Sequence, residues 1–507
     1  MARAGVVVMF LNGAAIVAAF VREATIAYYY GASAELDAFW VAFTIPRFLA
    51  DTMLFSLTSA LIPVLVDLRE KRGDKNAVRL SAPPVTMAVL LSVGLLIVCN
   101  AVAPFIIKFL APGFDEARTA SAVRLMMMVS PFVVLFGFVS LLKVQQNSLD
   151  RFFMPEASRS IISLGVVGII WLFASSWGVD ALASAFVVGA SVAVIANCLT
   201  LLRIGWRPKI KLSFSPEVKE FLKRLPSAVA VCGVFYVNVV VGRIFASYLQ
   251  SGTISLLRYA SSVTSVPIVL LGGAMATVLL PRFSKAWSTD DKEDFRQVLR
   301  KSLTLAIFVG SIAAGLLASH ADIVVRLLYQ RGQFGAEETT VCAMIIGALS
   351  GVVPLGPLNA VLSRAAFSSR ALLLPILAAA VQTASKITVC WLLLESMKEL
   401  AIPIGTVVSV FLSVLFYSFF ISHRLKDVTI LKFLAIRLAI GICVGGGLFT
   451  VSFAHSVFPL PRHWQLLTVL LLQTAIIILT LILDREGRQL LFWTITSSIR
   501  RRRAPDV

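Results

Sequence analysis

The chain has 507 residues, of which 58% are hydrophobic and 14% charged, and its formal net charge is +19. A mean hydropathy of +0.88 excludes a water-soluble globular protein. In that setting the positive charge does not indicate nucleic-acid binding, and we expect no nucleic-acid partner. The composition predicts a polytopic membrane protein.

About fourteen apolar stretches are long enough to cross a hydrocarbon core of roughly 30 Å as helices. Because lipid offers no hydrogen-bond partner to open backbone groups, we predict an all-α protein. In chain order the predicted spans are 5–29, 38–66, 84–110, 123–145, 154–176, 180–203, 225–248, 253–281, 301–320, 339–362, 371–394, 401–422, 430–454 and 465–484.

Basic residues are concentrated in alternate loops and in the C-terminal tail. Clusters of Lys and Arg follow the second, sixth and eighth spans, at 69–79, 203–224 and 282–300, and the tail ends in the run Arg500 to Arg503. Loops rich in Lys and Arg stay in the cytoplasm. We therefore expect both termini to be cytoplasmic and the tail to contact anionic membrane lipids.

Two short sequence strings from the first half of the chain recur in similar form in the second half, at nearly the same spacing. The string SALIP ends at Pro63 and TVLLP ends at Pro281, while IIKFLAPGFDEA from Ile106 recurs as VVRLLYQRGQFGAEE from Val324. This pattern predicts a duplicated half and a pseudo-two-fold axis along the membrane normal. We expect an N-lobe over 1–203 (TM1–6), an amphipathic cytoplasmic linker over 204–224, a C-lobe over 225–424 (TM7–12), two added spans over 425–484 and a basic tail over 485–507.

Charged residues inside predicted spans are the candidate functional residues, because a charge at mid-membrane costs at least about 2.5 kcal/mol and is kept where it faces a cavity or a partner. A cationic cavity suits an anionic substrate, since guanidinium groups pair with phosphate oxygens. In the alternative, purely structural interpretation, Arg22 pairs with Asp37 or Asp51. The candidates are Arg22, Glu23, Asp37, Arg47, Asp51, Arg243, Arg258 and Lys386.

No pattern for a metal, an organic cofactor or covalent chemistry is visible in the sequence. The six cysteines are scattered singly without metal-ligand or disulfide spacing, and no phosphate-binding glycine loop of the ATPase type occurs. We therefore expect a transporter rather than an enzyme. Its direction would come from an ion gradient, the membrane potential or downstream consumption of the substrate.

Three segments carry a family resemblance. The strings REATIAYYYGASAELDAFWVAFTIPRFL, ATVLLPRFSKAW and LLYQRGQFGAEET resemble the landmarks of the MviN/MurJ family of lipid II flippases, in the multidrug/oligosaccharidyl-lipid/polysaccharide exporter superfamily. The resemblance extends from about residue 10 to 485. It implies two six-helix lobes and a C-terminal helix pair forming a groove for a polyprenyl tail. It also implies movement of an undecaprenyl-diphosphate-linked glycan to the outer leaflet by alternating access.

The resemblance is incomplete at the cavity charges. Arg22, Glu23 and Asp37 match family positions, whereas other basic and acidic family positions fall at Ile16, Ala50, Asp51 and near Ser262 and Ser265. Arg47 and Arg258 lie about one helical turn from vacated positions and are candidates to replace the missing charge.

These departures leave several functions open. The favoured substrate is lipid II, and the main alternative is another lipid-linked oligosaccharide, such as an exopolysaccharide or O-antigen unit. A cation-coupled drug exporter is less favoured, because basic residues outnumber acids among the candidate cavity charges. A non-transporting scaffold for cell-wall synthesis proteins is the fourth interpretation. We expect a monomer in the bacterial inner membrane.

Overall fold

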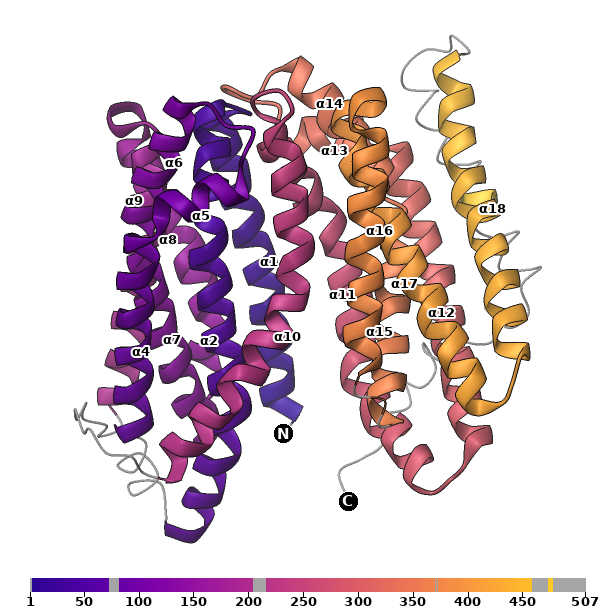
Figure 1. Ribbon diagram of the computed structural model, residues 1–507, viewed down its shortest axis with the longest axis horizontal. Coiled ribbons are helices and arrows are strands. Elements are labelled where there is room, and N and C mark those ends of the chain that lie inside the picture. The colour runs from indigo at the N-terminus through magenta and orange to yellow at the C-terminus, as the bar shows by residue number, and fades with distance from the viewer. Residues whose placement is uncertain are drawn as a thin grey trace. The chain divides into compact units, whose positions relative to one another are not determined.

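The computed structural model describes residues 2–72, 82–203, 216–369, 371, 373–457 and 473–476. Within these ranges the regular structure is helical, as predicted (Figure 1). Among the described residues, ten helices are long and apolar enough to cross a membrane, or up to twelve if each of two bent helix pairs is one span. The predicted count of fourteen is therefore not confirmed. The span predicted at 465–484 and the tail at 485–507 lie almost wholly outside the described residues. Of the linker predicted at 204–224, residues 204–215 also lie outside them, and 216–224 belong to the helix Pro216–Ser247.

The chain divides into two compact units. The first contains residues 1–255 and the segment Leu328–Glu338. Its helices are α1 (Ala2–Tyr30), α2 (Ala34–Arg72), α4 (Ala82–Ala101), α5 (Ala103–Leu110), α6 (Glu116–Val129), α7 (Pro131–Ser148), α8 (Phe153–Trp177), α9 (Val179–Leu202) and α10 (Pro216–Ser247).

The second unit contains Leu256–Leu327 and the chain from Thr339 onward. Its helices are α11 (Thr253–Ser288), whose first turn belongs to the first unit, α12 (Lys292–Ser319), α13 (Ala321–Leu328), α14 (Ala336–Leu349), α15 (Val352–Ser368), α16 (Leu374–Met397), the 3-10 turn η1 (Lys398–Leu400), α17 (Ala401–Leu425) and α18 (Thr429–Val457). The unit boundary near Ser255 differs from the lobe boundary predicted at 204–224, because α10 packs against α2. The lobe boundaries rest on the repeat and stay a prediction.

The helix boundaries repeat as the landmarks predict. The eight-residue helix α5 (103–110) corresponds to the eight-residue helix α13 (321–328) at an offset of 218, and α6 corresponds to α14 at an offset of 220. In both copies the short helix precedes a turn and a fourteen-residue helix. This correspondence of elements supports the duplication.

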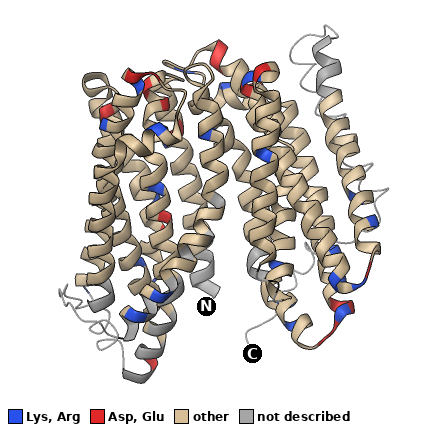
Figure 2. Cartoon of the chain, in the orientation of Figure 1, with Lys and Arg blue, Asp and Glu red and all other residues tan. Residues whose placement is uncertain are grey.

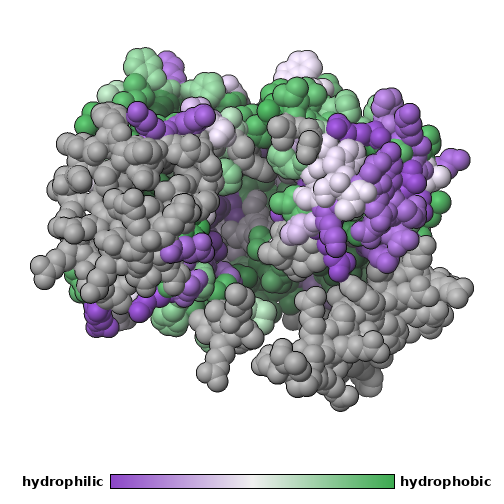
Figure 3. Space-filling view, turned by 90° about the horizontal axis from the view of Figure 1, so that it is seen from below, coloured by the Kyte–Doolittle hydropathy of each residue, from purple (hydrophilic) through white to green (hydrophobic). Residues whose placement is uncertain are grey.

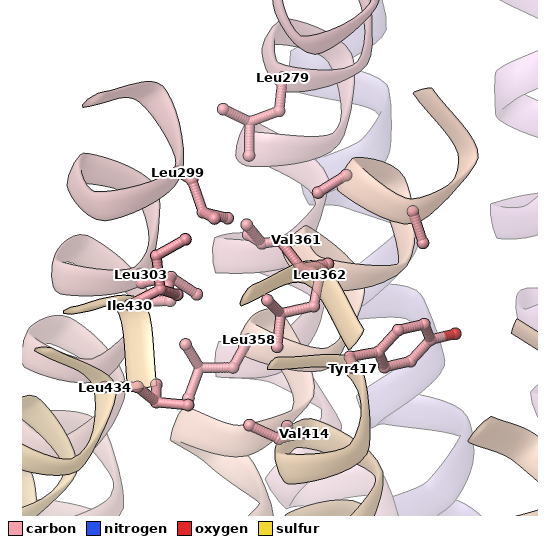
Figure 4. Packing of buried hydrophobic residues seen from close by; sticks show 14 of the residues in the cluster. Leu279, Leu299, Leu303, Leu358, Val361, Leu362, Val414, Tyr417, Ile430 and Leu434 are labelled. Atoms are coloured by element: carbon pink, nitrogen blue, oxygen red, sulfur yellow. The ribbon is translucent and has the colours of Figure 1, made fainter. Parts of the chain in front are cut away.

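The core of the second unit is formed by branched and aromatic side chains from α11, α12, α15, α17 and α18. At most 1% of the surface of each of four such residues is exposed: Leu299, Leu358, Val414 and Leu434 (Figure 4). Full burial of such a side chain from water is worth about 1.5–3 kcal/mol. Within a bilayer, however, lipid replaces water, so close packing and satisfied polar groups matter more.

Close packing is clearest where α12 meets α18. A Cβ added at Gly441 would lie 2.5 Å from Ser311 Oγ, and one added at Gly315 would lie 2.9 Å from the Gly445 oxygen. Small residues therefore allow the two helices to approach closely, as is typical of helix pairs in membranes. α18 lies at the edge of the second unit beside α12 (Figure 1).

Charged residues are sparse along the described helices and gather near their ends (Figure 2). In the view of Figure 3, hydrophilic residues cover the second unit over the ends of α11 and α12. Here Asp427 accepts hydrogen bonds from Thr429 N at 2.9 Å and Thr429 Oγ1 at 2.6 Å, and Arg296 Nε lies 3.2 Å from its carboxylate. Asp427 thus joins the start of α18 to α12.

This junction predicts a pH-dependent stability. The hydrogen bond from Thr429, with the charge of Arg296, lowers the pKa of Asp427. A lowered folded-state pKa stabilises the protein above the ordinary Asp pKa of about 3.9, and that stabilisation is lost as pH falls through the folded value. We expect Asp427→Asn to lower the melting temperature by about 1–3 °C at pH 7, and by less near pH 3. Asp290→Asn, at an exposed position, is the control; an equal loss at both pH values would contradict the assignment.

Candidate functional site

Arg22 and Glu23 form a buried ion pair in the C-terminal third of α1. Arg22 Nη2 lies 2.7 Å from Glu23 Oε1, and Glu23 is 2% exposed. Arg22 Nη1 also donates to Ser163 Oγ on α8 at 3.4 Å, and its guanidinium lies 5.7 Å from the Phe186 ring centroid on α9. Arg22 therefore pairs with its sequence neighbour Glu23, a partner that the alternative structural interpretation, with Asp37 or Asp51, did not name.

Arg47 and Asp51 form a second pair one turn apart on α2. Arg47 Nε lies 3.0 Å from Asp51 Oδ2, and the guanidinium lies 5.3 Å from the Phe136 centroid. The same carboxylate oxygen accepts a hydrogen bond from the Tyr236 hydroxyl of α10 at 2.8 Å. The Arg47 side chain is 43% exposed and that of Asp51 31%, compared with 16% for Arg22. Arg47 is thus the more accessible of these two arginines.

Asp37 caps the first turn of α11. Its carboxylate accepts hydrogen bonds from Gly252 N at 2.7 Å, Ser255 N at 2.7 Å and Ser255 Oγ at 2.6 Å. The first backbone N–H groups of a helix have no partner within it, and a carboxylate there is also favoured by the helix dipole. Arg243 on α10 attracts the same carboxylate electrostatically. Asp37 is 3% exposed, so it acts here as a structural acceptor.

Turns distant in sequence meet beside this cap. Gln333 N donates to the Tyr28 oxygen at 2.9 Å, and Gly332, with φ of +61°, packs against Tyr28. Gly252, with φ of +92°, packs against Ala32. Any other residue at either position would have to adopt a left-handed backbone conformation, and its Cβ would collide with the backbone of the α1–α2 turn. Glycine avoids both problems and so permits the two contacts. The landmark loop of the second sequence half thereby docks on the α1–α2 turn.

The remaining two candidates lie in the second unit. Arg258 follows the capped turn of α11 and is partly exposed, while Lys386 on α16 is 6% exposed. Lys386 packs near α17, where a Cβ at Gly405 would lie 3.5 Å from its backbone oxygen. The structure therefore groups Arg22, Glu23, Asp37, Arg47, Asp51 and Arg243 in one unit and places Arg258 and Lys386 in the other.

Selecting charges alone missed several polar residues. Tyr236 completes the Arg47–Asp51 cluster. In the span predicted at 225–248, Tyr236 is the one tyrosine apart from Tyr248 at the end, and this position could have marked it as a candidate. A buried network also joins α7, α8 and α9, in which Gln146 Nε2 donates to Asn197 Oδ1 at 2.8 Å and Asn197 Nδ2 donates to Ser158 Oγ at 2.8 Å. Among the described residues, no group of three His, Cys, Asp or Glu side chains is arranged to hold a metal.

Many apolar spans, a repeated order of helices and an ion pair buried within one of those spans define a polytopic helical membrane protein. The family model described as "Lipid II flippase MurJ" matches residues 26–471. The chain therefore belongs to the MurJ family.

Relatives and solved structures agree with this membership. A probable lipid II flippase MurJ of Rhizobium tropici is 28% identical over 66% of this chain, and the match spans 64% of that relative, just under two thirds of its length. A solved lipid II flippase MurJ in an inward closed conformation covers 96% of this chain and 99% of its own, with a TM-score of 0.76 and 20% identity. An inward-facing multidrug exporter of the MATE family covers 84% of this chain and 99% of its own, with a TM-score of 0.67 and 13% identity. The two structural likenesses show the fold.

Proposed function

We propose that this chain is a flippase that moves an undecaprenyl-diphosphate-linked glycan, first of all lipid II, from the cytoplasmic to the outer leaflet. Membership of the MurJ family across residues 26–471 is the observation that carries this proposal. The chain works as a transporter, without covalent chemistry, in the bacterial inner membrane with both termini in the cytoplasm. Another lipid-linked oligosaccharide is the alternative substrate, because several cavity charges typical of the family are absent here.

The Arg47–Asp51–Tyr236 cluster supports recognition of a diphosphate. Arg47 is the accessible cation, and it is held by a carboxylate that has a second partner in the Tyr236 hydroxyl. When a diphosphate enters, Arg47 exchanges the carboxylate for phosphate oxygens, and Asp51 keeps its hydrogen bond to Tyr236. Such an exchange avoids leaving a carboxylate without a partner in a poorly hydrated site. Arg22 supplies a second guanidinium for the same substrate.

Asp37 is assigned a gating role. It joins α2 to the start of α11, and the contacts of Gly332 and Gly252 lie beside it. In alternating access, one end of the substrate path closes while the other opens. The proposed lobes over 1–203 and 225–424 would separate at this end when Asp37 releases the first turn of α11. The direction of transport comes from the membrane potential or an ion gradient.

The remaining assignments extend this proposal. Residues 425–484, of which 458–472 and 477–484 lie outside the described part of the chain, are proposed to supply a groove for the polyprenyl tail. The protein is proposed to work as a monomer that contacts anionic lipids and cell-wall synthesis proteins. Arg243, Arg258 and Lys386 are proposed to contribute positive charge along the path. A drug exporter is less favoured, because the chain matches the MurJ family model and only shares a fold with the MATE exporter.

Replacing the two candidate compensating arginines tests the recognition proposal. We expect Arg47→Ala and Arg258→Ala each to lower rescue of a strain depleted of its own lipid II flippase, with the larger effect at Arg47 because its pair with Asp51 is accessible. The loss at Arg47 should be about tenfold or more, the effect of one charge-assisted hydrogen bond. Rescue is scored together with protein level in membranes, and Arg118→Ala on α6 is the control. Full rescue by the double variant, with Arg22→Ala inactive, would contradict compensation.

A further inference from the structure

A pocket of about 690 Å³ lies between α5 and α6 in the first unit. It is separate from the charged pairs described above. Its walls combine apolar side chains of α6 and the preceding turn with cations from both helices. The residues that define it are Phe114, Val123, Met127, Lys108 and Arg124, with Glu116 at the start of α6.

α5 places this pocket at the membrane interface. The chain bends by 71° between α4 and α5, so the short helix runs across the direction of the span that precedes it (Figure 1). Phe105 is 77% exposed and Phe109 67% exposed, while Ile107 and Leu110 are buried against the protein. A short amphipathic helix with exposed aromatic rings is typical of a segment lying at the level of the lipid headgroups. The pocket beneath it therefore opens where a headgroup and the first part of an acyl chain are found.

Comparison with the duplicated copy shows that Lys108 lacks the acidic partner that its counterpart has. At the offset of 218, Lys108 on α5 corresponds to Arg326 on α13, and Pro104 corresponds to Asp322. Arg326 Nε lies 2.9 Å from the carboxylate of Asp322 within its own helix. Pro104 offers no such carboxylate to Lys108, whose side chain lines the pocket. The cation that is neutralised locally in one copy is thus directed to the pocket in the other.

The second cation lies on α6. Arg124 Nη1 contacts Asp180 Oδ2 of α9 at 2.6 Å, which fixes the guanidinium while more than half of the side chain stays exposed. A guanidinium carries five N–H donors, so one ion pair leaves donors for a phosphate. Val123 and Met127 continue the wall below it as an apolar surface.

We propose that this pocket binds one anionic glycerophospholipid of the bilayer. Its phosphate lies between Lys108 and Arg124, and the upper part of one acyl chain covers Val123 and Met127. Lys108 has no carboxylate at the position that Asp322 takes in the second copy, so its ammonium group supplies the positive charge that favours a headgroup of net negative charge, while Arg124, paired with Asp180, offers its remaining N–H donors. The bound lipid would hold α5 against α6. This binding does not require that the protein flip any substrate, so the two proposals can fail independently.

Native mass spectrometry of the full chain in detergent tests the site. The protein is titrated with palmitoyl-oleoyl phosphatidylglycerol and, separately, with the phosphatidylcholine of the same acyl chains. We expect tighter retention of phosphatidylglycerol and a loss of about tenfold in its binding for Lys108→Gln, the effect of removing one charged contact. Arg118, in the first turn of α6, pairs with Asp115 and does not line the pocket, so Arg118→Gln should bind as the unsubstituted protein does.

A second variant separates the pocket from general surface charge. Ala120→Trp fills the pocket and keeps both cations, and it should weaken binding of both phospholipids. Thermal unfolding of each variant confirms that it is folded, and Lys108→Gln, at an exposed position, carries the test if Ala120→Trp does not fold. Equal phosphatidylglycerol binding by Lys108→Gln and the unsubstituted protein would overturn the proposal. Displacement of the lipid by millimolar inorganic phosphate would also overturn it, because the site would then be one for a free anion.

Discussion

We expect Asp37→Ala to abolish rescue of a flippase-depleted strain and Glu35→Ala to leave rescue intact. Asp37 accepts three hydrogen bonds from the start of α11, and its loss leaves Gly252 N and Ser255 N without their carboxylate acceptor. Each hydrogen bond to a charged group contributes about 1.5–3 kcal/mol. Glu35 is the control: it lies two residues away in the first turn of α2 and carries the same charge, but it is exposed and makes none of these hydrogen bonds to α11.

Asp37→Asn distinguishes a gate from a simple structural contact. The asparagine oxygen can still accept from Ser255, but the charge that interacts with the α11 dipole and with Arg243 is removed. We expect Asn to retain most of the folded protein in membranes and to lower rescue by roughly tenfold. If the Asn and Ala variants are both folded and both rescue fully, Asp37 has no gating role.

Arg22→Ala gives the second large effect, with losses of both stability and transport. The substitution leaves the Glu23 carboxylate buried at 2% exposure without the guanidinium 2.7 Å away. Breaking a buried ion pair by removing one partner costs about 3–5 kcal/mol. We therefore expect a lower melting temperature and a lower protein level, together with loss of rescue.

The double variant Arg22→Ala/Glu23→Gln assigns the cause. Neutralising the carboxylate removes the uncompensated charge, so stability should return towards that of the unsubstituted protein. Transport should stay at least tenfold low if Arg22 contacts the diphosphate. Arg22→Lys keeps the charge but not the planar pair of donors, so its transport should lie between that of the double variant and that of the unsubstituted protein. Full recovery of transport in the double variant would show that Arg22 only balances Glu23.

The fold class was predictable because it depends on composition and on the spacing of the repeated sequence strings. Apolar stretches of roughly twenty residues or more indicate membrane helices, and the repeated strings at Ile106 and Val324 fixed a spacing that α5 and α13 reproduce. The number of spans was less predictable. The stretch predicted as one span at 84–110 is a helix pair bent by 71° before Ala103, and hydropathy does not register a bend.

The pairing of the candidate charges could not be read from the sequence. Neighbouring residues on a helix do not normally face each other, yet the long side chain of Arg22 reaches Glu23. The partners of Asp37 lie 215 and 218 residues further along the chain, and no local pattern relates them. Tyr236 was missed because its role depends on the packing of α10 against α2, which only the fold determines.

Reconstituted transport tests the central proposal most directly. The purified full chain is placed in phosphatidylethanolamine–phosphatidylglycerol vesicles containing fluorescent lipid II, and the fraction of label accessible to an added quencher is followed with and without a membrane potential. We predict movement between leaflets at several times the rate of protein-free vesicles, and a loss of most of that increase for Arg47→Ala. A rate equal to that of protein-free vesicles, from protein that is folded and inserted, would contradict the proposal.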